Sequence, residues 1–236
     1  MDWQSRTELV MGAEKLAKLQ KSHVLVAGLG GVGGMAAEML VRAGIGRLTI
    51  ADNDTIHSSN LNRQIIALNS TIDHYKADVM AGRLMDINPL LSLTVSKQYL
   101  IREAIPAILE TAYDYVVDAI DTLSPKMYLI LRSLLKGYPL VSSMGAGGKF
   151  DPEMVSIADI ADSYQCRLAH YIRKNLHKKG VYTGFKVVFS PEHVSTETIK
   201  VTEEDKNKKS MVGTISYMPA IFGCYMASVV IRDLIK

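Results

Sequence analysis

The chain has 236 residues, of which 48% are apolar and 22% are charged, so it can bury a sizeable core in one α/β domain but is too short for two large ones. Its formal net charge of +3 allows an anionic ligand but excludes the strongly basic composition of a general nucleic-acid coat protein. Only two cysteines are present, Cys166 and Cys224, which excludes a disulfide framework and a four-cysteine zinc site.

The first half of the chain alternates between helix-like and strand-like runs. The two widely separated cysteines favour a reducing cytoplasm, and residues 1–6 contain no apolar core of the secretory type. Apolar periodicity predicts helices at residues 7–20, 31–43 and 75–88 and strands at residues 23–27, 47–51, 91–95 and 113–117. This order is typical of a Rossmann-like α/β fold, a mostly parallel twisted sheet with helices on both faces. We expect one domain over residues 1–236.

The second half begins in the same way and then changes. It predicts helices at residues 125–135 and 162–179 and strands at residues 139–144, within 151–160 and at 184–190. Residues 191–213 are polar and charged with almost no periodicity, which predicts a mobile crossover segment. We therefore expect a C-terminal mixed strand and helix region, in which residues 162–213 supply a basic helix and a mobile insertion.

Residues 213–231 are uncharged and about as long as a bilayer is thick. A membrane span would explain this length, but Pro219 and several hydroxyl groups weaken that interpretation. A buried final helix that opens at Pro219 explains the same residues, because proline is favoured in the first turn of a helix. We favour the buried helix and expect no stable membrane insertion.

A glycine-rich turn follows the first predicted strand. Backbone N–H groups at a helix start bind phosphates without side chains, and we assign this role to Gly28, Gly30, Gly31 and Gly33. Asp52 ends the second strand, at the position of a ribose-binding acid, and its neighbour Asp54 either joins the nucleotide site or caps the following loop. A tight packing turn without a ligand remains the alternative.

Two cations beyond the second strand distinguish this chain from a hydride-transfer enzyme. Arg63 and Lys76 could reach the β- and γ-phosphates, where an NAD-dependent reductase would hold its nicotinamide arm. Both are expected to be exposed to ligand. We assign nucleotide contacts to Ser59 as well, and to Asn60 and Gln64, which could also hold the arginine in place. A solvated polar loop is the alternative for each residue alone.

An acidic pair follows the fourth predicted strand. A carboxylate at Asp121 suits Mg²⁺ that arrives with a triphosphate, and its neighbour Thr122 is assigned to the nucleotide site. Asp118 is expected to be structural, bonded to loop amides. Considered by itself, Asp121 would be interpreted as a turn residue. The presence of Arg63 and Lys76 is what favours a catalytic role.

Taken together, these residues resemble the ATP-dependent adenylating enzymes related to ubiquitin activators, of the ThiF and MoeB type, over nearly the whole chain. The family pattern stands here as Gly28–Gly33, Asp52–Asp54, Ser59–Gln64, Lys76 and Asp118–Asp121. The resemblance implies activation of a carboxylate by ATP and Mg²⁺, giving an acyl-adenylate and pyrophosphate. It implies that Arg63 and Lys76 contact phosphates, Asp52 the ribose and Asp121 the metal. It further implies a homodimer in which Arg6 enters the partner subunit's site.

The branch of the family is indicated by what the chain lacks. Sulfur-carrier activators usually hold zinc with two Cys-x-x-Cys pairs, and this chain has none. It resembles instead the branch that dehydrates threonylcarbamoyladenosine in tRNA, where loss of water closes a ring. Adenylation of the C-terminus of a ubiquitin-like sulfur carrier is the alternative, with a sulfur-relay or carrier protein as partner. A nucleotide-sensing scaffold would bind ATP without pyrophosphate exchange.

A protein that binds tRNA is expected to carry a cluster of basic side chains. The candidate is the basic helix, with further lysines on the mobile segment, at Arg167, His170, Arg173, Lys174, His177, Lys178, Lys179, Lys206, Lys208 and Lys209. A charged helix that is simply solvated is the alternative. Cys166 lacks a nearby base beyond His170, and Cys224 is expected to pack in the final segment, so no catalytic thiol is assigned.

Overall fold

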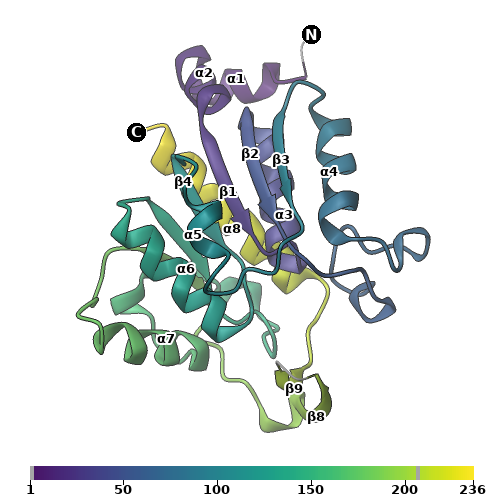
Figure 1. The fold of residues 1–236 in the computed structure, drawn as a ribbon, viewed down its shortest axis with the longest axis vertical. Coiled ribbons are helices and arrows are strands. Elements are labelled where there is room, and N and C mark those ends of the chain that lie inside the picture. Colours follow the sequence, from purple (N-terminus) through teal and green to yellow (C-terminus); the bar gives the residue numbers. More distant parts are fainter. Residues whose placement is uncertain (1–2, 206–207) are drawn as a thin grey trace.

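Seven strands form one sheet in the order β3-β2-β1-β4-β5-β7-β6, and helices cover both of its faces (Figure 1). The computed structural model describes residues 3–205 and 208–236. Neighbouring strands are parallel except β6, which runs antiparallel to β7. The strands are β1 (His23–Ala27), β2 (Arg47–Ala51), β3 (Ser92–Ser96), β4 (Tyr115–Asp118), β5 (Leu140–Ser143), β6 (Ser156–Asp159) and β7 (Lys186–Phe189). The predicted Rossmann-like fold class is confirmed.

The N-terminal helical region differs from the prediction in one respect. The predicted single helix is two helices, α1 (Ser5–Met11) and α2 (Ala13–Lys21), separated at Gly12. Gly12 has a φ of 84°, which L-residues with a side chain rarely adopt. Apolar residues recur at helical spacing on both sides of Gly12, so periodicity alone could not locate the break.

The two faces of the sheet bury different sets of helices. Behind the sheet as drawn in Figure 1 lie α3 (Gly31–Ala43) and α8 (Tyr217–Leu234), and α4 (Lys76–Ile87) packs into the same apolar cluster. In front lie α5 (Ile105–Ile108) and α6 (Leu123–Leu135), and α7 (Arg167–His177) shares their cluster. Strand β1 is buried along its whole length because these layers cover it on both sides.

As predicted, the final segment is a helix that packs into the core, with one face buried. Pro219 lies in the first turn of α8, and Gly223 allows the close approach of α8 to α3. A Cβ at Gly223 would lie 2.5 Å from the carbonyl oxygen of Val32, so a side chain there would force the two helices apart. Among the described residues, no helix combines the length and hydropathy needed to cross a bilayer.

The segment predicted as irregular contains regular structure. Residues 191–213 include the antiparallel pair β8 (Ile199–Asp205) and β9 (Lys208–Val212), which form a separate two-stranded sheet with a register shift between Val201 and Asp205. These strands carry polar residues without clean alternation, so hydrophobic periodicity gives no strand signal for them. Short 3-10 turns complete the fold at Ser58–Asn60, Asn69–Thr71, Pro152–Met154, Ile160–Asp162 and Thr196–Thr198.

Candidate functional site

The predicted site residues meet at one edge of the sheet. Because β1, β2 and β4 are parallel, the segments that follow them leave the same edge, which we call the rim. Hydrogen bonds join these segments: the Gly28 amide donates to the Ala51 carbonyl at 2.8 Å, and the Ala119 amide donates to the Ala27 carbonyl at 2.9 Å. This edge is where ligands bind in open parallel sheets.

Three glycines of the turn are required by the backbone conformation and packing of the turn. Gly28 has a φ of 89°. A Cβ at Gly33 would lie 1.8 Å from the Gly28 carbonyl oxygen, and one at Gly31 would lie 2.8 Å from Cβ of Pro219. At Gly30 an added Cβ would meet only the Nε2 atom of Gln64, at 3.9 Å, among the described residues. The turn therefore leaves space at Gly30, the N-cap of α3, where phosphates bind to helix N-termini.

The Asp52 carboxylate is held in a fixed orientation. Its Oδ2 atom accepts the Leu29 amide at 2.6 Å, and its Oδ1 atom accepts the Asp54 amide at 2.8 Å. Burial raises the pKa of Asp52, while the charge of Lys76 and these two hydrogen bonds lower it. Each carboxylate oxygen keeps a second lone pair, so the group can still accept hydrogen bonds from a pair of hydroxyls.

Lys76 is buried rather than freely exposed. Its Nζ atom lies 2.8 Å from Oδ2 of Asp54, and its side chain is 8% exposed, whereas that of Asp54 is 57% exposed. Asp54, in the loop after β2, therefore holds the ammonium group of Lys76. Because the exposed carboxylate can turn toward water, a more strongly charged ligand could take its place beside Lys76.

Arg63 is held by different residues from those predicted. Its Nη1 atom donates to the Ser59 carbonyl at 2.8 Å and to Oδ1 of Asn62 at 3.0 Å. Asn60 instead accepts the His57 amide within its own turn, and the Oε1 atom of buried Gln64 has no hydrogen-bond partner among the described residues. Asn62 was missed because nothing in a polar loop sequence indicates which amide turns toward the arginine.

Asp121 lies close enough to Arg63 to affect it. Burial lowers the pKa of the Arg63 guanidinium, and the charge of Asp121 raises it. Asp121 is exposed, and the next residue, Thr122, is the N-cap of α6. The described residues contain no group of three or more acidic, histidine or cysteine side chains that could hold a metal ion. A divalent ion here would therefore need phosphate oxygens beside Asp121, as Mg²⁺ bound with a nucleotide has.

Asp118 is structural, as predicted, and its bonding is more extensive than expected. It is fully buried, its Oδ1 atom accepts the Ile120 amide at 3.1 Å, and its Oδ2 atom accepts the Ser142 hydroxyl at 2.6 Å. It also pairs with Lys126 at 2.7 Å, a contact that the sequence alone did not predict.

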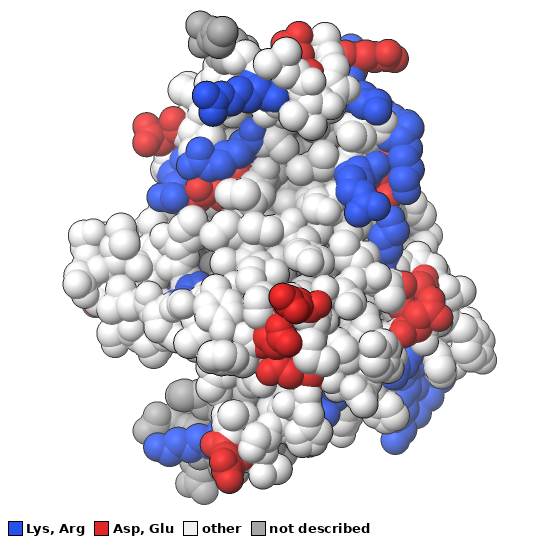
Figure 2. All heavy atoms as spheres, turned by 180° about the vertical axis from the view of Figure 1, so that it is seen from behind, with Lys and Arg blue, Asp and Glu red and all other residues white. Residues whose placement is uncertain are grey.

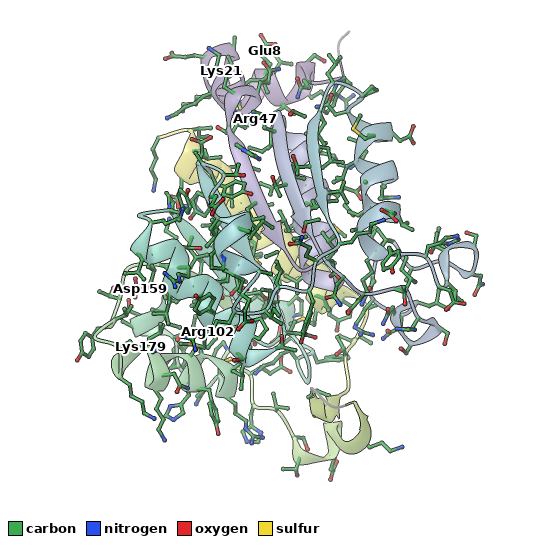
Figure 3. The ribbon with its side chains drawn as sticks, in the orientation of Figure 1. Glu8, Lys21, Arg47, Arg102, Asp159 and Lys179 are labelled. Carbon is green, nitrogen blue, oxygen red and sulfur yellow. The ribbon has the colours of Figure 1, made fainter. Side chains whose placement is uncertain are left out.

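The structure does not bring Arg6 to this site within one chain. Arg6 is exposed on α1, which lies at the end of the molecule where β1 begins, whereas the glycine turn follows the other end of β1 (Figure 1). Glu8, on the same helix, marks that position in Figure 3, far from α7 and the β8–β9 hairpin. Leu9 and Val10 on α1 are both 87% exposed.

The basic helix α7 has one buried and one exposed face. Ala169, Ile172 and Leu176 are buried. The exposed side chains at α7 and just beyond it are basic or aromatic, at Arg167, His170, Tyr171, Lys174, His177, Lys178 and Lys179. A surface pocket of about 370 Å³ is lined by Arg167, His170 and Tyr171, together with Gln165, Cys166 and Arg173. Arg173 is partly buried and donates to the Ser163 carbonyl at 2.5 Å, so it belongs to the fold more than to the exposed face.

The remaining predicted residues are the lysines of the polar segment and the two cysteines. Lys206 and the side chains of Lys208 and Lys209 lie outside the described residues. Cys166 is buried at the start of α7. The expectation that Cys224 packs in the final segment is wrong, because Cys224 lies on the exposed side of α8. Seen from behind, acidic side chains gather near the middle of the molecule and at its right edge, and many of the basic side chains lie toward the top, among acids (Figure 2).

Comparison with known proteins gives consistent matches. The model of the ThiF family matches residues 4–236. The tRNA threonylcarbamoyladenosine dehydratase of Bacillus subtilis (strain 168) is 38% identical over 239 residues, covering 98% of this chain and 94% of that protein. A crystal structure of E. coli tRNA N6-threonylcarbamoyladenosine dehydratase in complex with ATP has a TM-score of 0.88 at 33% identity, covering 99% of this chain and 96% of that one. The sulfur carrier protein ThiS adenylyltransferase of Escherichia coli (strain K12) is 39% identical, but over 56% of this chain and 53% of that protein.

Proposed function

The chain belongs to the ThiF family, and from this membership we propose that it is an ATP-dependent enzyme that removes water from threonylcarbamoyladenosine in tRNA. The observation that carries the proposal is the near-complete match, in sequence and in fold, to dehydratases that act on this nucleoside. The match to a sulfur-carrier activator covers only about half of either chain, which disfavours the alternative.

The first chemical step is transfer of adenylate to the substrate. A carboxylate oxygen of the threonylcarbamoyl group attacks the α-phosphorus of ATP, the bond from that phosphorus to the bridging oxygen breaks, and pyrophosphate leaves. Negative charge accumulates on the departing pyrophosphate. Cations positioned beside it stabilise that charge more in the transition state than in the ground state.

Residues of the rim are suited to this step. The amides around Gly30 would receive phosphate oxygens at the start of α3, and Asp52 would accept the ribose hydroxyls. Arg63, oriented by Ser59 and Asn62, and Lys76, released from Asp54, would contact the leaving pyrophosphate. Asp121 would hold Mg²⁺, which neutralises charge on the phosphates when it is bound.

The second step closes the ring. A nucleophilic atom of the same threonylcarbamoyl group attacks the activated carboxyl carbon and gives up its proton, and AMP leaves with its bonding electrons and with the former carboxylate oxygen. The substrate has then lost the elements of one water molecule, while ATP has become AMP and pyrophosphate. No enzyme thiol enters this sequence, in agreement with the burial of Cys166.

We also propose a homodimer that acts in the cytoplasm. Leu9 and Val10 expose apolar side chains on α1, next to Arg6, and burying them against a second copy would carry Arg6 toward the partner's rim. Two unpaired cysteines suit a reducing compartment.

The RNA would bind across the exposed face of α7. Cationic side chains there can contact phosphates without reading sequence, and Tyr171 offers a ring on which a base can stack. In Figure 1, α7 lies at the end of the molecule toward which β1 runs, the same end as the glycine turn. One bound RNA could therefore contact α7 and present its modified nucleoside to the rim.

Pyrophosphate exchange distinguishes the proposed function from its alternative. Labelled pyrophosphate should enter ATP when tRNA carrying threonylcarbamoyladenosine is present, and not with the same tRNA lacking the modification. Exchange that instead requires a ubiquitin-like carrier protein would favour the alternative, and binding of ATP without exchange would favour a sensing scaffold.

A further inference from the structure

A fully buried ion pair lies directly beneath the proposed site. Nζ of Lys126 is 2.7 Å from Oδ2 of Asp118, and both side chains are 0% exposed. Burying two charges costs solvation energy that an apolar pair of similar size would not cost. A pair of this kind is therefore weak evidence for stability, and its hydrogen bonds indicate what else it does.

Those hydrogen bonds fix the peptide groups that immediately precede Asp121. Lys126 Nζ donates to the Ile120 carbonyl at 3.0 Å, while the Ile120 amide donates to Asp118 Oδ1 at 3.1 Å. The Ser142 hydroxyl donates to Asp118 Oδ2 at 2.6 Å and so ties the pair to the neighbouring strand β5. Both backbone polar groups of Ile120 are thus fixed by charged partners, which make the stronger hydrogen bonds.

The same short loop is seated against the glycine turn. The Ala119 amide donates to the Ala27 carbonyl at 2.9 Å, and the Ala119 carbonyl oxygen lies where it would be 2.7 Å from a Cβ at Gly28. A loop held on one side by the turn and on the other by a buried ion pair has little freedom to rotate. Asp121 follows immediately, and its carboxylate acts on Arg63 across the rim.

We propose that Lys126 and Asp118 are positioning residues, which fix residues 119–121 so that Asp121 presents its carboxylate to Arg63 and to a divalent ion bound with the nucleotide. This inference rests on the proposed role of Asp121. Lys126 also lies in the first turns of α6, so it links the start of that helix to the loop. An apolar pair could fill the same volume but could not orient the Ile120 peptide.

The test neutralises the pair while keeping its shape. In the double variant Asp118→Asn with Lys126→Met, the amide can still bond Ile120 and Ser142 and no charge is left unpaired, while the ion pair and the bond to the Ile120 carbonyl are both lost. Thermal unfolding should show a folded protein. The Mg²⁺ concentration that half-saturates ATP binding, measured by calorimetric titration, should rise by about tenfold or more, while ATP binding in the presence of a chelator should change by less than about twofold.

Two further variants keep the inference falsifiable. The single variant Lys126→Arg retains a charged donor and should keep most of the wild-type Mg²⁺ response. Should the double variant not fold, Ser142→Ala loosens the network without stranding a charge and should shift the Mg²⁺ requirement by about threefold. An unchanged Mg²⁺ response in a folded neutral pair, or in Ser142→Ala, would overturn the inference.

A double-mutant cycle separates this inference from the site assignment. If Lys126 acts through Asp121, the neutral pair should add less than about twofold to the loss in pyrophosphate exchange already caused by Asp121→Asn. Losses that multiply would overturn the positioning role alone. A wild-type Mg²⁺ response in Asp121→Asn would overturn both the metal assignment and this inference.

Discussion

Sequence patterns indicated only partly how the single residues at the rim are arranged. The placement of the glycine turn, Asp52 and Asp121 at this edge could be predicted, because their residue types and spacing follow the strands that present them. The ion pair of Lys76 with Asp54 and the bond of Asn62 to Arg63 could not, because loop side chains choose partners by local geometry that spacing does not encode. The buried ion pair of Lys126 with Asp118 could not be predicted either, since a lysine within a helix normally indicates a solvated face.

The contrast between Gly30 and Gly33 gives a matched pair of variants. Gly30→Ala should fold normally, because the new Cβ meets only Gln64 at 3.9 Å among the described residues, but it should weaken ATP binding by about tenfold, since it fills the space for a phosphate. Gly33→Ala should lower the free energy of unfolding by at least about 2 kcal/mol, because its Cβ would overlap the Gly28 carbonyl. Thermal unfolding and ATP titration measure both effects. Wild-type ATP affinity in Gly30→Ala would place the phosphates elsewhere.

At the scale of elements, strongly periodic segments could be predicted and irregular ones could not. The central strands and α3, α4, α6 and α8 lie close to their expected ranges because burial imposes a clear apolar pattern on them. The break at Gly12 was not predicted, because the helical spacing of apolar residues continues across it. The β8–β9 hairpin was not predicted, because its strands have no clean alternation of apolar residues. The basic face of α7 was predicted, although Arg173 turns away from it.

The exposed face of α7 yields a prediction about salt dependence. Replacing Arg167, Lys174 and Lys178 by alanine should weaken tRNA binding and reduce the slope of log affinity against log salt by about one for each phosphate that the variant no longer neutralises. The matched control replaces three exposed lysines at the other end of the molecule, Lys15, Lys18 and Lys21 on α2. Filter binding across a salt series measures both. Equal effects in the two triple variants would mean that α7 carries no RNA site.

At the scale of the whole molecule, the role proposed for Arg6 requires a second copy of the chain. Arg6 lies at the opposite end of β1 from the glycine turn, so only a second copy could bring it to the rim (Figure 1). On the rear face, basic side chains gather toward one end and acidic side chains near the middle, and α1 exposes apolar residues (Figure 2). Neither feature is visible in the net charge of +3.

Mixed dimers test the contribution of Arg6 in trans. Arg6→Ala and Arg63→Ala should each be inactive alone, because the first removes an arginine from the partner's site and the second from its own. After subunit exchange, half of the dimers are mixed and each has one intact site, so activity should recover to about a quarter of the wild-type value. No recovery, although mass measurement shows that mixed dimers have formed, would mean that both arginines act within one chain.

The function proposed for the whole molecule is that its cationic rim cleaves ATP in order to activate a carboxylate on tRNA. The decisive assay incubates the protein with ATP, Mg²⁺ and tRNA bearing threonylcarbamoyladenosine, and then determines the nucleoside mass and the nucleotide products. We expect a nucleoside lighter by one water molecule, with AMP and pyrophosphate formed in equal amounts, and neither change in Arg63→Ala. An unchanged nucleoside alongside full consumption of ATP, or full dehydration by Arg63→Ala, would refute this mechanism.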